Sequence, residues 1–172
     1  MRTAGLVLTA LLLASCGPGA PEPEPASAPA AAPAATPDPN GWAFAIGKNS
    51  VELAWMTEAS PGASPLRLIC GRGSGIMVEA ATLTPIGSEE RLSIGAGDEP
   101  LALVAVTAET PRGPVIRATG AADEAFLTAL EAGGPIAVSY GAQHYGPLAS
   151  PGEAMRRAFA DTCRKLNAGT PV

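Results

Sequence analysis

The chain is poor in histidine, in aromatic residues and in long apolar stretches. Its 172 residues include one histidine, His144, and only 4% are aromatic. A single histidine excludes metal sites built from several histidines, and we predict neither a bound metal nor a cofactor. No apolar stretch approaches the roughly 20 residues that a helix needs to cross a bilayer. The sequence therefore predicts no membrane-spanning helix.

Positive charge is also scarce. Eleven lysines and arginines stand against sixteen aspartates and glutamates, which gives a net charge of −5 and a pI near 4.8. Basic runs are lacking, and arginines are not interleaved with aromatic residues as they are on nucleic-acid-binding surfaces. We therefore predict no nucleic-acid partner and interpret the mild acidity as favouring solubility.

The N-terminus has the order of a secretory signal peptide. Arg2 supplies a positive charge, residues 6–13 form an apolar run, and the small residues Ala14 and Ser15 follow it. This order is typical of a cleaved signal, and the run is too short to span a bilayer. We therefore predict that residues 1–15 are removed.

The end of this signal has a more specific pattern. Leu13-Ala14-Ser15-Cys16 resembles the lipobox of bacterial lipoproteins, in which the cysteine thiol receives a diacylglycerol and the chain is cut just before it. The resemblance covers residues 1–17 and implies lipidation of Cys16. Two or three acyl chains hold a small protein stably on a membrane. An ordinary signal peptide, with Cys16 as an incidental thiol, is the alternative.

Residues 16–40 begin with this cysteine and continue as a stretch rich in proline and alanine. The stretch has no large apolar side chain to bury, so we predict a disordered tether. In the polyproline conformation it would reach up to roughly 70 Å. The residue after the cysteine is Gly17 and not the Asp of inner-membrane retention in enteric lipoproteins. The resemblance therefore implies an outer-membrane lipoprotein that faces the periplasm.

Residues 41–172 are predicted to form a single globular domain. At roughly 130 residues, such a domain buries enough apolar surface to fold without a cofactor. Short runs of apolar residues, several of them alternating with polar ones, are separated by turn residues, which is typical of antiparallel strands. We predict strands at 42–46, 51–56, 65–70, 76–80, 91–96, 101–108, 114–120 and 135–140.

Two helices are predicted in the last third of the chain. Asp123 is a suitable cap for a helix that ends at Gly133, and Ser150 begins a capping-box pattern before a second helix. One face of this second helix carries Met155, Phe159, Cys163 and Leu166. Because strands and helices do not alternate regularly, we predict an α+β, mainly β fold. It would be an antiparallel β-sandwich or half-barrel with a short helix and a C-terminal helix packed on it.

If Cys16 is lipidated, two cysteines remain. Cys70 lies at an inward strand position and Cys163 on the apolar face of the last helix. In a compartment that permits disulfides, we predict that they pair. Separate buried thiols and a redox-active pair are the alternatives. The order of a strand, a Gly-Pro pair, a helix and Phe-x-x-x-Cys is similar to small disulfide-bonded β-sandwich proteins of bacterial envelopes; this likeness carries over no site residues.

A polar stretch at 141–147 is the candidate functional loop, with Gln143, His144 and Tyr145. His144 beside a hydroxyl would suit a small hydrolase, whereas a surface histidine without a catalytic role is the alternative. The glycine-rich residues 71–75 lack the lysine of a nucleotide-binding loop, and we interpret them as a hairpin turn.

No motif identifies a catalytic activity. We therefore predict a non-enzymatic binding or accessory module, held on the membrane by its lipid, whose partner is a periplasmic protein or the cell wall. A small hydrolase using His144 and an inhibitor of lytic enzymes with residues 141–149 as a protruding loop are the alternatives. An exposed apolar patch or groove would favour the binding module. A hydroxyl within reach of His144 would favour the hydrolase.

Overall fold

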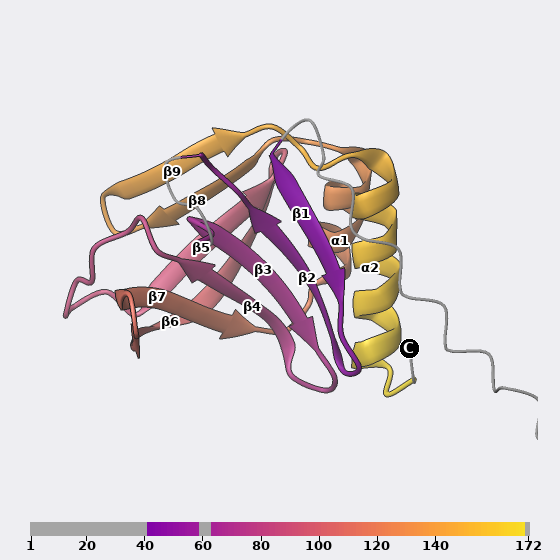
Figure 1. Cartoon of the computed structure of the whole chain (residues 1–172), viewed down its shortest axis with the longest axis horizontal. Helices are drawn as coiled ribbons and strands as arrows, with labels where there is room; N and C mark the ends of the chain where they lie inside the picture. The colour runs from indigo at the N-terminus through magenta and orange to yellow at the C-terminus, as the bar shows by residue number, and fades with distance from the viewer. Residues whose placement is uncertain (1–40, 59–62, 171–172) are drawn as a thin grey trace, which may run out of the picture. The chain divides into compact units, whose positions relative to one another are not determined.

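The computed structural model describes residues 41–58 and 63–170. In this part of the chain, nine strands form one antiparallel sheet in the order β1-β2-β3-β4-β7-β6-β5-β8-β9. The sheet curls into a half-barrel, and two helices lie side by side against it (Figure 1). The elements are β1 (Trp42–Ile46), β2 (Ser50–Trp55), β3 (Leu66–Gly71), β4 (Gly75–Ala80), β5 (Arg91–Ala96), β6 (Glu99–Thr110), β7 (Gly113–Gly120), α1 (Glu124–Ala132), β8 (Ile136–Tyr140), β9 (Gln143–Leu148) and α2 (Glu153–Asn167).

The mainly β fold with a short helix and a C-terminal helix is confirmed, and of the two predicted architectures the half-barrel is the one found. One continuous sheet holds all the strands of the described residues, so they are not divided between the two sheets of a sandwich. The first four strands form two hairpins: β1 pairs with β2, and β3 pairs with β4 with Gly71 opposite Gly75. The glycine-rich residues 71–75 are therefore a hairpin turn, as predicted.

The core lies between the concave face of the sheet and the helices. Alternate strand residues point inward because successive side chains of a strand face opposite sides. On β3 these are Leu66, Leu68 and Cys70, all fully buried. The helices complete the core with Phe126, Leu127, Leu130, Phe159, Ala160, Cys163 and Leu166.

The curl brings the two ends of the sheet together at one point. The indole Nε1 of Trp42 in β1 donates to the carbonyl oxygen of Ala149, just after β9, over 2.6 Å. Trp42 also packs edge-on against Trp55, with ring centroids 5.3 Å apart. Trp42 is 1% exposed. Its buried N–H thus finds a partner across the opening of the half-barrel, which a buried indole requires.

The ends of the helices agree only in part with the prediction. The Asp123 carboxylate accepts from the N–H of Ala125, and α1 ends at Gly133 with a φ of 92°, as predicted. The capping box at Ser150 was a wrong prediction, because α2 begins later and its N-cap is Gly152.

Arg156 gives the physical reason for this later start. Its guanidinium donates to the carbonyl oxygen of Pro151 over 2.6 Å and to that of Glu131, at the end of α1, over 3.2 Å. These contacts tie the segment before α2 to α1.

Candidate functional site

A disulfide joins the sheet to the last helix. Cys70 in β3 and Cys163 in α2 are bonded, with Cα atoms 5.4 Å apart and a separation of 93 positions in sequence. Both cysteines are fully buried. This confirms the predicted pair. Because the bond is buried among apolar residues, we interpret it as a structural disulfide; redox-active cysteines must be accessible to the thiols with which they exchange.

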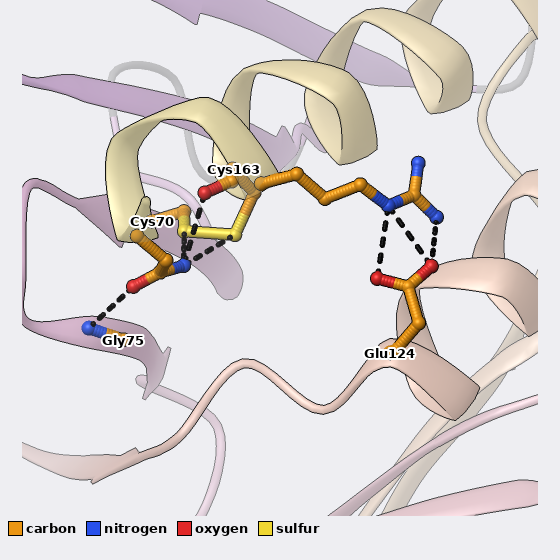
Figure 2. The surroundings of a disulfide bond; sticks show 6 residues. Cys70, Gly75, Glu124 and Cys163 are labelled. Atoms are coloured by element: carbon orange, nitrogen blue, oxygen red, sulfur yellow. Dashed lines mark hydrogen bonds and ion pairs between the residues drawn. A yellow bond between two sulfur atoms is a disulfide. The ribbon is translucent and has the colours of Figure 1, made fainter. Parts of the chain in front are cut away.

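One polar side chain lies against the disulfide (Figure 2). The Asn167 Nδ2 donates to the Cys163 carbonyl oxygen over 3.0 Å and lies 3.2 Å from the Cys70 sulfur, while Asn167 Oδ1 accepts from the Gly75 N–H. Gly75 has a φ of +70°, and a Cβ there would collide with the carbonyl of Gly120. Only glycine fits such a close backbone approach. Asn167 thus ties α2, the disulfide and the β3–β4 hairpin together.

Ion pairs join the two helices. Arg164 in α2 pairs with Glu124 over 2.7 Å and with Glu131 over 2.8 Å, both in α1; Figure 2 shows the first of these pairs. The hydrogen bonds from Arg164 lower the pKa of both carboxylates, and those carboxylates raise the pKa of Arg164. Because Glu124 is exposed and Arg164 and Glu131 are only half-buried, the cluster supports helix packing modestly.

The segment predicted as a functional loop is a strand. Gln143, His144 and Tyr145 belong to β9, which pairs with β8 and forms one edge of the sheet. The loop prediction is therefore wrong, and with it the protruding loop of an inhibitor. Gly146 and Pro147 made this strand difficult to predict from the sequence, because proline has no backbone N–H to donate to a neighbouring strand. An edge strand tolerates that loss.

Gln143 and Tyr145 have structural partners. The Gln143 amide exchanges two hydrogen bonds of 2.8 Å with the backbone of Thr84. Tyr145 is half-buried against the core. Burial raises the pKa of Tyr145, and the hydrogen bond with Trp55 opposes this effect. Both side chains therefore attach the edge strand to the rest of the domain.

His144 lies opposite a serine on the neighbouring strand. Its Nδ1 is 2.9 Å from the hydroxyl of Ser139, and the two residues are paired in register between β8 and β9. In serine hydrolases the nucleophile contacts Nε2, and a carboxylate orients Nδ1. Here the serine occupies the Nδ1 side, and among the described residues no carboxylate pairs with the ring. The pair thus has the serine–histidine contact of a hydrolase, but through Nδ1 of the ring and not through Nε2.

A ladder of charged side chains crosses the outer face of the sheet, and sequence analysis missed it. Glu52, Arg67, Glu79 and Arg117 come from β2, β3, β4 and β7. Their ion pairs measure 2.7 Å between Glu52 and Arg67, 2.7 Å between Arg67 and Glu79, and 2.6 Å between Glu79 and Arg117. The hydrogen bond with Glu52 raises the pKa of Arg67, against the opposing effect of burial.

A groove of about 580 Å³ lies over this ladder. Residues from β3, β4 and β7 line it, together with the turn between β6 and β7. Its charged lining residues are Arg67, Glu79, Arg112 and Arg117, and its walls include Pro111 and Val115. Several charged side chains thus converge in this groove. A second depression, of about 430 Å³ beside Asn167, has no titratable residue in its lining.

The signal for this ladder is present in the sequence but incomplete. Arg67, Glu79 and Arg117 each occupy an outward position between inward apolar residues of a predicted strand. The alternation places each charge on the outer face, but it does not show that β4 pairs with β7 with Glu79 opposite Arg117. That pairing depends on a contact between segments about forty residues apart in the sequence.

Compared with protein-family models, with curated proteins and with solved structures, the chain shows no significant match. Among the described residues, no helix combines the length and hydropathy that crossing a bilayer requires. The same residues contain no group of three or more His, Cys, Asp or Glu side chains placed to share a metal ion. Cys16 and the tether lie outside the described residues.

Proposed function

We propose that this protein is a lipid-anchored envelope protein that faces the periplasm and acts as a binding module. The observation that carries the proposal is Leu13-Ala14-Ser15-Cys16 at the end of an apolar signal segment, followed at once by the Pro/Ala-rich stretch. Acylation of Cys16 would hold the domain at a membrane without any spanning helix.

The cysteines support this compartment. Of the three cysteines in the chain, Cys70 and Cys163 form a disulfide, which leaves Cys16 as the single remaining one. Structural disulfides persist in oxidising compartments such as the periplasm and are rare in the cytosol. The disulfide thus supports export of the domain to the periplasm. It also leaves Cys16 as the one free thiol that could be lipidated.

The groove on the outer face supports a binding role. Ligand sites are typically concave, with mixed apolar walls and a few convergent polar groups. The groove over Arg67, Glu79 and Arg117 has this composition. Its place on the convex side keeps it clear of the packed helices, so a ligand can reach it while the core stays closed.

The anchor is tested by changing the cysteine that would carry it. The Cys16→Ser variant should lose labelling by an alkynyl palmitate analogue and move from the membrane fraction to the soluble periplasmic fraction. Ser15→Ala is the matched control, since it keeps a small residue before the cysteine and should stay lipidated. Density-gradient separation of the two membranes tests the outer-membrane location. Unchanged membrane partitioning of Cys16→Ser would contradict the proposal.

A small hydrolase is the second candidate function, and the 2.9 Å contact between Ser139 and His144 is the observation that favours it. An activated serine would react with a fluorophosphonate probe, because a neighbouring base increases its nucleophilicity. Labelling that disappears in both Ser139→Ala and His144→Gln would replace the binding module with a hydrolase. We expect no labelling, because the serine faces Nδ1 and no carboxylate among the described residues pairs with the ring.

A further inference from the structure

The groove on the outer face collects positive charge on an acidic protein. Three of the eleven lysines and arginines of the chain line it, namely Arg67, Arg112 and Arg117, although the net charge is −5. Glu79 is the only acidic residue of its lining. We propose that this groove binds the carboxylate of a ligand that carries a small apolar group beside it, such as the C-terminal end of a short peptide. The inference rests on the proposed binding role and specifies its ligand class.

Two of the three arginines, Arg67 and Arg117, are held in place by glutamates, and hydrogen-bond donors of Arg117 and Arg112 remain free among the described residues. Glu79 accepts from Nη1 of Arg67 and from Nε and Nη2 of Arg117, so one carboxylate positions two guanidinium groups. Within the described residues, the Nη1 of Arg117 and the whole guanidinium of Arg112 have no hydrogen-bond partner. A guanidinium presents its N–H groups as a rigid planar fork that matches a carboxylate. Positioning the fork beforehand reduces the entropy lost when a ligand binds.

The balance of charge favours a single negative charge. In the ladder itself, two arginines offset two glutamates, Glu52 and Glu79. Arg112 then adds one uncompensated positive charge to the groove. A carboxylate neutralises that charge. A phosphate monoester carries about −1.5 to −2 at pH 7 and would place excess negative charge beside Glu79.

The walls of the groove determine which group next to the carboxylate fits. They are formed by Ala81, Pro111, Pro114 and Val115, which are small or medium-sized and apolar. The lining contains no aromatic ring on which a base or sugar would stack. Such walls suit a methyl or short aliphatic group next to the carboxylate, because burial of apolar area then adds to the charge interaction.

The proposal is tested by calorimetry on the full chain purified in detergent. The three probes are N-acetyl-alanyl-alanine, its C-terminal amide, and inorganic phosphate. We expect the free acid to bind and the amide to bind at least about tenfold more weakly, because the amide loses the charge-assisted hydrogen bonds. The side-chain Nε–H NMR signals of Arg112 and Arg117 should shift with the acid.

Arg112→Gln is the decisive variant, because its side chain has no partner whose loss would affect folding. It should weaken binding of the acid about tenfold. Arg157→Gln, the same charge change on the exposed face of α2, should leave binding unchanged.

Three results would overturn the proposal: equal binding of acid and amide, unchanged affinity in Arg112→Gln, or no binding of any probe. Tighter binding of phosphate than of the acid would overturn the choice of a carboxylate. None of these results changes the partitioning of Cys16→Ser, so the anchor and the ligand site can fail separately.

Discussion

The inner face of the half-barrel is covered by two helices, whereas its outer face carries charged residues and a groove. On β6, neighbouring residues show the contrast: Leu103 points inward and is 2% exposed, while Val104 points outward and is 63% exposed. The inner face is stabilised by burial and by a covalent bond. The outer face relies on ion pairs between half-exposed groups, which contribute little each. In our proposal, stability and ligand binding are assigned to opposite sides of one sheet.

The largest expected effect is on the covalent bond of the inner face. Replacing Cys70 and Cys163 together by alanine should lower the free energy of unfolding by about 4 to 5 kcal/mol, because the bond closes a long loop in the unfolded chain. Chemical denaturation of the oxidised protein, the reduced protein and the double variant measures this loss of unfolding free energy. Cys16→Ser, which removes the third cysteine, should unfold like the wild type. A double variant as stable as the wild type would refute the stabilising role of the bond.

Two substitutions on one strand compare the faces directly. Leu103→Ala should cost about 3 kcal/mol, because it leaves a cavity in the core. Val104→Ala should stay within about 0.5 kcal/mol, because the side chain is already in solvent. Urea unfolding of both variants gives the difference. Similar losses would mean that the outer face is covered by something in solution.

The charge ladder should matter less than the core. Glu79→Gln removes the ion pairs with Arg67 and Arg117 and should cost about 1 to 2 kcal/mol. The loss should shrink at high salt, since screening weakens partly exposed pairs. Glu99→Gln, an exposed glutamate without an ion pair among the described residues, should have no effect. A salt-independent loss would point to packing and not to charge.

The smallest expected effect concerns the contact between the helices. Arg164→Gln should cost up to about 1 kcal/mol at neutral pH. Arg164 lowers the pKa of Glu124 and Glu131 in the folded state. Their contribution is therefore present above the unfolded value of 4.5 and is lost as the pH falls through the lower folded values.

Unfolding measured across pH tests this linkage. The wild type and Arg164→Gln should differ at pH 7 and converge as the pH falls below 4.5 and through the lower folded pKa values of the two glutamates. Lys48→Gln, which removes an exposed cation in the turn between β1 and β2 that has no ion pair among the described residues, should match the wild type throughout. A difference that persists at low pH would assign the effect to the apolar part of the Arg164 side chain.

The elements that sequence analysis predicted are those with a local signal. Residues 42–46 and 91–96 became strands with the predicted bounds, and Asp123 caps its helix. The strand at 143–148 was missed because Gly-Pro interrupts its pattern, and its stability depends on contacts made only in the folded domain: pairing with β8 and the hydrogen bonds between Gln143 and Thr84. The start of α2 was misplaced because Arg156 holds both Pro151 and the carbonyl oxygen of Glu131 at the end of α1, and the N-cap is Gly152 and not Ser150.

The sequence by itself determined which residues are buried and which cysteines pair. Apolar alternation assigns each strand residue to a face, and Cys70 and Cys163 both fall at predicted buried positions, where they pair. Only the tertiary structure decided that Arg67, Glu79, Arg112 and Arg117 meet at one groove. The reason is the strand order: β4 lies beside β7, and residues far apart in sequence become cross-strand neighbours only when the sheet forms.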